Sequence, residues 1–395
     1  MSDNDSLNDR RDFLKKAAYA TAGVATLPGQ FTLLAKSANA GELAPTIKSR
    51  GLAAFDTSGD LQKWEFERRP IGDNDILIDI KFSGICHSDI HQELGHWRKQ
   101  QYPQVPGHEI AGIVAAVGKN VTKFKVGDKA GVGCMVDSCM ECHNCTHDEE
   151  HLCERNQTVW TYGNPDSTSP SGITQGGYSN NLVVRDHFAI KIPESIDLQH
   201  AAPLLCAGIT TYSPLMRANF KPGDKVAVAG IGGLGHLAVK LAVSKGAEVY
   251  AFTTTADKIK DIQSFGAKEV VVVNSLDNLA PYAGMMDYVI STIPYDFNIA
   301  AYASLAKPYH SLTQVGMPVH GQLSVNNFMM IRNRVNLNGS LIGGIAETQE
   351  VMDYCAQHHI YPQIQVIHAS QVSHAWTQVV NKEARYRYVI DSSTI

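Results

Sequence analysis

Four cysteines lie close together in the middle of the chain, at Cys139, Cys142, Cys145 and Cys153. Two, two and seven residues separate them, and with this spacing four thiolates can surround one tetrahedral Zn²⁺ and leave no coordination position for a substrate. A bacterial iron–sulfur run also begins C-x2-C-x2-C, but it continues with x3-C-P, whereas Glu154 follows the fourth cysteine here. The spacing therefore favours a structural zinc over an iron–sulfur cluster, and it favours disulfides least.

Three further residues have the types that a catalytic zinc needs. Cys86 lies in Gly-Ile-Cys-His-Ser-Asp, His108 in Pro-Gly-His-Glu, and Cys206 in Leu-Leu-Cys-Ala-Gly. Two thiolates and one imidazole are a known ligand set for a zinc that keeps one position exchangeable. Each segment alone is weak evidence, because an isolated histidine or apolar-flanked cysteine is more often a packing residue. We expect Cys134 and Cys355 to be small buried apolar side chains.

A glycine-rich turn, Gly230-Ile-Gly-Gly-Leu-Gly235, follows a predicted buried strand at 225–230 and opens a predicted helix at 234–245. In this context the backbone amides and the helix N-terminus bind the pyrophosphate of a dinucleotide. The next predicted strand, 248–252, leads into three threonines and then Lys258, where an NAD enzyme would present a carboxylate. Hydroxyls and an ammonium accept a 2′-phosphate, so the sequence favours NADP(H). Asp257 would weaken this preference if the alignment shifted by two or three residues.

The elements that must position these residues fall into two classes. From residue 75 to about 132, short β-branched runs alternate with glycine and proline turns, which is typical of an irregular β-rich domain. From residue 225 the pattern becomes strand, turn, helix, strand, and runs at 270–273, 288–291 and 311–315 extend a parallel sheet. A chain of 395 residues is too long for one compact core. We therefore predict an α/β protein of two domains.

Composition indicates an ordinary enzyme. Hydrophobic residues make up 44%, charged residues 18%, and the formal net charge is −5. Because no stripe of lysines and arginines is present, we expect no nucleic-acid partner. No apolar run is long enough to cross a bilayer, so we expect no membrane span.

The first forty residues differ from the rest of the chain. Arg10-Arg11 and Phe13-Leu-Lys precede a weakly apolar stretch at 17–35 and a small-x-small sequence, Ala38-Asn-Ala40. This order resembles a twin-arginine export signal, although Asp9 stands where such signals usually carry Ser or Thr. We expect residues 1–40 to be removed after folding and cofactor loading, and the mature protein to be periplasmic. If the signal is not used, the protein stays cytoplasmic and this segment is an amphipathic helix.

Together these segments resemble the zinc-containing medium-chain alcohol dehydrogenases, and most of all their cinnamyl alcohol dehydrogenase-like branch, from about residue 52 to residue 390. The resemblance implies a GroES-like β-rich catalytic domain over 41–201 and 341–395, and a Rossmann doubly wound parallel-sheet nucleotide domain over 202–340. The matching segments are Gly84 to Asp89, Pro106 to Glu109, Gly133-Cys134, Gly176 to Ser179, Ala202 to Gly208, Gly230 to His236, Gly339 to Gly343, Glu347 to Glu350 and Arg385 to Val389.

The same resemblance assigns roles at the metal. Cys86, His108 and Cys206 would hold the catalytic zinc, and Glu109 would take its fourth position in the resting state. Asp89 would orient His108 through the other ring nitrogen. With the four-cysteine site, this gives two zinc ions per chain, one catalytic and one structural.

The resemblance also implies a path for protons and a binding site for the nucleotide. Ser88 would take the first proton step, the cofactor ribose the second, and His91 the exit, unless His91 is only a surface histidine. His87 would lie near the cofactor phosphates. The expected cofactor contacts are His87, Gly230, Gly232, Gly233, Leu234, Gly235, Thr253, Thr254, Thr255, Lys258, Thr292, Val315 and Gly316.

The sequence thus predicts an NADP(H)-dependent zinc oxidoreductase for an aldehyde and primary alcohol pair, in which zinc polarises the substrate oxygen. Trp97 and Trp160 would line the substrate pocket or pack in the core. The resemblance further implies a homodimer formed through residues 325–337. Two alternatives are an exported iron–sulfur electron carrier and a nucleotide-binding module without catalysis.

Overall fold

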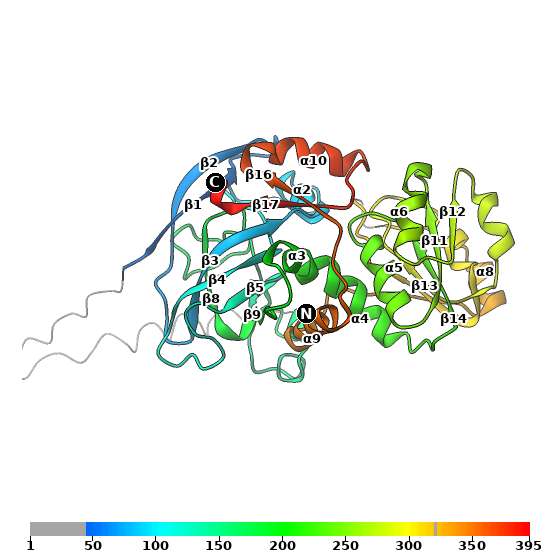
Figure 1. Ribbon diagram of the computed structural model, residues 1–395, viewed down its shortest axis with the longest axis horizontal. Helices are drawn as coiled ribbons and strands as arrows, with labels where there is room; N and C mark the ends of the chain where they lie inside the picture. The colour runs from blue at the N-terminus through cyan, green and yellow to red at the C-terminus, as the bar shows by residue number, and fades with distance from the viewer. Residues whose placement is uncertain (1–44, 320–321) are drawn as a thin grey trace, which may run out of the picture. The chain divides into compact units, whose positions relative to one another are not determined.

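The computed structural model describes residues 45–319 and 322–395, so the predicted export signal at 1–40 lies outside the described residues. The described part contains an irregular, mainly antiparallel sheet and a six-stranded parallel sheet with helices (Figure 1). This architecture confirms the predicted α/β class.

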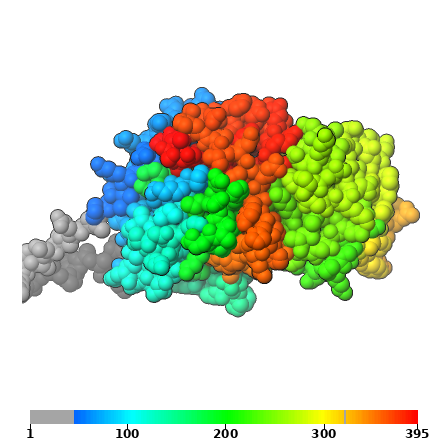
Figure 2. All heavy atoms as spheres, viewed as in Figure 1, coloured from blue at the N-terminus to red at the C-terminus, as the bar shows by residue number. Residues whose placement is uncertain are grey.

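The first sheet contains strands from both ends of the described chain, in the order β16-β17-β3-β4-β5-β9, with β8 also paired to β3. Figure 2 shows the C-terminal residues, in orange and red, beside the blue residues near the start of the described chain. The strands are β3 (Asp75–Gly84), β4 (Ile110–Val117), β5 (Lys129–Val132), β8 (Asn181–Arg185), β9 (Ala189–Lys191), β16 (Ile364–His368) and β17 (Arg387–Asp391). Two separate antiparallel pairs are β1 (Ile47–Ala54) with β2 (Leu61–Arg68), and β6 (Met135–Asp137) with β7 (Val159–Trp160).

The register of β3 and β4 positions chemically important residues. The strands are antiparallel, and Ser83 pairs with Ile110. The chain leaving β3 therefore runs beside the chain entering β4, and the Gly84 N–H donates to the Glu109 carbonyl at 2.8 Å. This pairing brings the residues after Gly84 next to those before Ile110.

All strands of the second sheet are parallel, in the order β12-β11-β10-β13-β14-β15. In chain order this is the doubly wound arrangement, whose topological switch point lies between β10 and β13. The strands are β10 (Lys225–Ala229), β11 (Glu248–Thr253), β12 (Glu269–Val272), β13 (Met286–Ser291), β14 (Ala306–Gln314) and β15 (Asn336–Gly339). The helices of this part are α5 (Gly235–Ser244), α6 (Ile259–Ser264), α7 (Ile299–Ala303) and α8 (Asn327–Asn333).

The central strand β10 is buried on both faces. Val226 and Val228 belong to one apolar cluster, and Ala227 and Ala229 to another on the opposite face. A parallel strand covered on both sides has this continuous apolar sequence, which is why the run was recognisable from the sequence.

The remaining helices are α2 (His87–Glu93), α3 (Leu198–Pro203), α4 (Ile209–Arg217), α9 (Ile345–His358) and α10 (Val372–Val380). The strands of the first sheet lie within 75–191 and 364–391, and those of the parallel sheet within 225–339. The residue boundaries proposed for the two domains, at 201/202 and 340/341, stay a prediction. Among the residues described, no helix is both long and apolar enough to cross a membrane.

Candidate active site

Four side chains from distant parts of the chain meet in one buried group, which we call the open cluster: Cys86, His108, Glu109 and Cys206. Their metal-binding atoms all lie within 4.8 Å of one another. The Cys86 and Cys206 sulfurs are 4.0 Å apart, and His108 Nε2 is 3.1 Å from the Cys206 sulfur. Tetrahedral zinc, with Zn–S of about 2.3 Å and Zn–N of about 2.0 Å, places such atoms about 3.5–3.8 Å apart. The donor set therefore fits zinc, and both measured distances lie within about 0.5 Å of the tetrahedral values.

Each ligand candidate is held at the end of an element. Cys86 is the residue before α2, and His108 precedes β4. Gly107 has φ +105°, and a Cβ there would lie 2.6 Å from the Tyr178 ring, so this turn requires glycine. Cys206 lies in a π-helical turn, Leu204–Gly208, between α3 and α4. Such turns are rare and occur frequently at functional sites.

Asp89 fixes the orientation of His108. One carboxylate oxygen lies 2.9 Å from His108 Nδ1, and the other accepts from the Cys86 N–H at 2.9 Å and from the Tyr178 hydroxyl at 3.0 Å. Burial acts to lower the pKa of His108, but Asp89 and the neighbouring thiols outweigh it and raise this pKa well above its ordinary value. The contact between Asp89 and Nδ1 holds the His108 ring with Nε2 toward the sulfurs.

Glu109 forms a buried ion pair with Arg387, whose side chain is only 5% exposed. The second oxygen of Glu109 has no partner in the described part of the chain. Burial raises the pKa of Glu109, and the charge of Arg387 opposes that rise. Arg387 also touches the glycine turn, since a Cβ at Gly233 would lie 2.6 Å from its Nη1. Arg387 lies in the matching segment Arg385 to Val389, but no role was predicted for it, because a single arginine in a late strand does not show which residue it pairs with.

The prediction for Cys134 holds only in part. Its side chain packs against the apolar core but is half-buried, and it lines the same cleft as His108 and Cys206. The reason is a close backbone approach: a Cβ at Gly133 would lie 2.6 Å from the Leu205 carbonyl oxygen, so only glycine lets this segment reach the Cys206 turn. Cys355, in contrast, is fully buried in the apolar core as expected.

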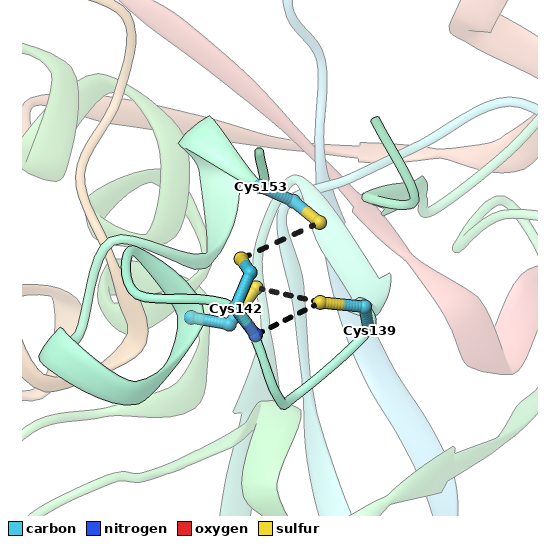
Figure 3. A group of neighbouring side chains, drawn as sticks. Cys139, Cys142 and Cys153 are labelled. Atoms are coloured by element: carbon cyan, nitrogen blue, oxygen red, sulfur yellow. Dashed lines mark hydrogen bonds between the residues drawn. The ribbon is translucent and has the colours of Figure 1, made fainter. Parts of the chain in front are cut away.

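The four cysteines at 139–153 form a second group, which we call the closed cluster. Figure 3 labels three of them, Cys139, Cys142 and Cys153. Cys139 and Cys145 sulfurs lie 3.7 Å apart, and Cys142 and Cys153 sulfurs 3.9 Å apart. Tetrahedral zinc requires about 3.8 Å between sulfurs. The Cys142 N–H also donates to the Cys139 sulfur at 3.3 Å. All eight cysteines lie in the described part, and none forms a disulfide.

A buried carboxylate joins the closed cluster to a distant helix. Glu150 lies three residues before Cys153 and is fully buried. It lies 2.6 Å from His187 Nε2 and accepts from the Ile345 N–H, the first residue of α9, at 3.0 Å. Gly344 permits this contact, because a Cβ there would lie 1.7 Å from the Asp148 carbonyl oxygen.

The open cluster faces a cleft of about 660 Å³ that the glycine turn also lines. Gly230 has φ +85°, a Cβ at Gly235 would lie 1.9 Å from the Gly230 carbonyl oxygen, and Gly232 faces open space. Gly235 supports the turn and is not on the cleft wall. The predicted cofactor residues that line the cleft are His87, Gly230, Gly232, Gly233, Leu234, Thr253, Thr254, Thr255, Lys258, Thr292, Val315 and Gly316.

The charges beside the three threonines suit a phosphate. Asp257 pairs with Arg385 at 2.5 Å and is not among the cleft-lining residues. Lys258 does line the cleft, and its ammonium donates to the Ile231 carbonyl at 3.2 Å. Burial, with help from Arg385, lowers the pKa of Lys258 to about 8. The acidic residue that would have disfavoured a 2′-phosphate is thus engaged by an arginine.

The predicted proton path lies on α2. Ser88 lines the cleft, with its hydroxyl oxygen 3.6 Å from the Cys86 sulfur. His91 also lines the cleft and is only 7% exposed, so it is not a surface histidine. Burial lowers the pKa of the neighbouring His87 to about 4, so His87 is neutral at ordinary pH. Trp97 and Trp160 both lie on the cleft wall.

Comparisons with known protein families identify both halves of the chain. Residues 72–194 match the family described as alcohol dehydrogenase GroES-like domain, and residues 233–357 match the family described as zinc-binding dehydrogenase.

Individual relatives match over nearly their full length. An NADP-dependent alcohol dehydrogenase C of Mycolicibacterium smegmatis is 44% identical and covers 87% of this chain and 97% of its own. The aldehyde reductase YahK of Escherichia coli is 41% identical, covering 88% and 99%. Among solved structures, a cinnamyl alcohol dehydrogenase from Helicobacter pylori complexed with NADP(H) has a TM-score of 0.83 at 42% identity, covering 88% and 99%. One from Sorghum bicolor has a TM-score of 0.84 at 36% identity, covering 88% and 98%.

Proposed function

This chain belongs to the zinc-containing medium-chain alcohol dehydrogenases, and on that premise we propose that it interconverts aldehydes and primary alcohols with NADP(H). The observation that carries the proposal is the convergence of Cys86, His108 and Cys206 on the cleft that the glycine turn lines. Neither an iron–sulfur carrier nor a non-catalytic module has support among the relatives.

The residues of the open cluster hold the catalytic metal. Cys86, His108 and Cys206 are the ligands, while Asp89 keeps His108 Nε2 directed at the sulfurs. The second oxygen of Glu109, which has no partner among the described residues, would be available as a fourth ligand. When bound, zinc acts as a Lewis acid toward the substrate oxygen, and the nucleotide gives or takes hydride at the carbon. The closed cluster holds the structural zinc.

Proton movement falls to side chains of α2. Ser88 Oγ lies 3.6 Å from the Cys86 sulfur and exchanges the proton of the substrate hydroxyl. His91 is three residues later, and residues three apart share one face of a helix. Its Nε2 is buried without a partner among the described residues, so it can accept the proton from the cleft.

Cofactor preference rests on Thr253, Thr254, Thr255 and Lys258, which line the cleft after β11. They offer hydroxyls and one ammonium to a 2′-phosphate, with no free carboxylate among them. Relatives named as NADP-dependent support the same preference.

The direct test is turnover by the purified zinc-loaded protein. NADPH should be oxidised with aromatic and alkyl aldehydes, and NADH much more slowly. Metal analysis should give about two zinc ions per chain. Absence of turnover over a broad aldehyde panel, by protein that still binds NADPH, would contradict the proposal.

A homodimer is part of the proposal. Strand β15 is an edge of the parallel sheet, and the preceding helix α8 exposes Phe328 at 71% and Ile331 at 76%. An open strand edge beside exposed apolar side chains favours pairing with a second copy. Ile331→Glu should give monomers in sedimentation, while Val126→Glu, at an exposed apolar position elsewhere, should not. A monomeric wild-type protein would contradict it.

Export to the periplasm is also part of the proposed function. Arg10-Arg11 and the small-x-small sequence ending at Ala40 support it. Fractionated cells should contain a shortened protein beginning near Gly41 in the periplasm, and Arg10→Lys with Arg11→Lys should abolish this. A full-length protein found only in the cytoplasm would contradict export.

A further inference from the structure

A second histidine lies directly behind His91. His91 Nδ1 and His96 Nδ1 are 2.9 Å apart, and the two ring centres are 5.2 Å apart. At this distance the two nitrogens share one proton, so one ring donates and the other accepts. His91 is almost fully buried, whereas His96 is exposed and does not line the cleft. The pair therefore connects the cleft to solvent.

The end of α2 builds this pair. Gly95 has φ +68°, and its N–H donates to the Gln92 carbonyl at 3.0 Å. A left-handed glycine after a helix reverses the chain. The His96 N–H then donates to the His91 carbonyl at 3.0 Å. Helical geometry alone would not bring residues five apart into contact, so the turn at Gly95 is what places one imidazole against the other.

The second ring nitrogen of His91, Nε2, is available to a group in the cleft. Its Nδ1 is taken by His96, and its Nε2 is buried with no partner among the residues described. The Trp97 and His87 rings flank it, with centres 5.2 Å and 5.6 Å from the His91 ring. Both neighbours restrict the tilt of the imidazole, and neither contacts Nε2.

We propose that His91 and His96 form a two-histidine proton wire and that His96, a positioning and relay residue outside the cleft, is its exit. This inference rests on the proposed function. During alcohol oxidation, Nε2 of His91 gains a proton from the cleft and Nδ1 passes a proton to His96 Nδ1. His96 then releases one from Nε2 to water. One proton enters and one leaves, only N–H bonds change, and aldehyde reduction runs the path in reverse.

The substitution His96→Asn tests whether His96 transfers a proton or only holds the His91 ring in place. The Asn Oδ1 occupies the place of Nδ1, so it keeps a hydrogen bond to His91 but cannot pass a proton on. We expect kcat for alcohol oxidation in a non-imidazole buffer to fall about tenfold or more, with NADP⁺ affinity unchanged. Added imidazole should restore the rate in proportion to its concentration. The matched control is His359→Asn. His359 is exposed and has φ +54°, a backbone conformation that Asn also tolerates, so this variant should keep the wild-type kcat.

Two results would overturn the wire: wild-type kcat in His96→Asn, or a loss that imidazole does not restore. Histidine-selective ¹⁵N NMR of the resting protein tests the pair without turnover. The wire requires one protonated and one bare Nδ1 in the two rings. If both Nδ1 atoms carried no proton, the wire would be refuted. This measurement does not depend on turnover, so it tests the wire separately from the proposed oxidoreductase function.

Discussion

The closed cluster draws its four cysteines from residues 139–153, whereas Cys86 and Cys206 of the open cluster stand 120 positions apart. The distances between sulfurs are nearly the same in both. Their surroundings differ: the open cluster has Asp89 behind a ligand and the Glu109–Arg387 ion pair beside it, while the closed cluster consists of four sulfurs on a loop. Long-range packing and buried charge thus bring together the residues of the open cluster, whereas one short segment supplies all four ligands of the closed cluster.

Removing a ligand from the open cluster should have the largest effect on catalysis. Cys206→Ser should lower kcat by about a thousandfold or more, the equivalent of about 4 kcal/mol of transition-state stabilisation. Zinc should fall from about two to about one per chain while the circular dichroism spectrum and Tm stay near wild type. If Cys206→Ser kept its activity, the open cluster would not be the catalytic site.

The same substitution in the closed cluster should act on stability. Cys142→Ser should lose one zinc and lower the free energy of unfolding by several kcal/mol, because a structural zinc contributes folding energy. Thermal unfolding with metal analysis measures this. If Cys142→Ser kept its Tm and lost only kcat, the two clusters would have the opposite roles.

Asp89→Asn should weaken zinc binding at the open cluster by about 10- to 100-fold, the usual effect of removing a carboxylate behind a histidine ligand. Competition with a chelator measures the affinity of each site. Asp148→Asn, beside the closed cluster and at φ +60° where Asn is well tolerated, is the control and should leave both affinities unchanged. Equal zinc loss from both variants would contradict this role.

The smallest effect concerns pH. Because the pKa of Lys258 is about 8 in the free protein, its ammonium is charged below pH 8 and loses its proton above it. NADP⁺ affinity should be highest between about pH 6, where the 2′-phosphate loses its second proton, and pH 8, and it should fall as pH rises further, by at most about tenfold per pH unit. NAD⁺ affinity should not follow, and Lys258→Met should abolish the dependence. Calorimetric titration at several pH values distinguishes these outcomes.

Much of this arrangement was predictable from short-range pattern. The apolar strand β10, the glycine turn and the spacing of the closed cluster each depend on neighbouring residues, and the structure forms all three. The convergence of Cys86, His108 and Cys206 depends on strand register and a π-helical turn, so only the family resemblance suggested it.

The contacts of three other residues could not be predicted from the sequence. Arg387 reaches Glu109 because the last strands return to the first sheet, and Cys134 reaches Cys206 because Gly133 has no side chain. His96 meets His91 through the reversal at Gly95. Each contact arises from backbone geometry that residue type and periodicity do not specify.

The Glu150 contact has a mechanical consequence. Because this carboxylate anchors the first amide of α9, it also fixes the segment just before that helix, where Leu341 and Ile342 line the cleft. The segment that carries the four cysteines therefore also supports, through Glu150, two residues of the cleft wall.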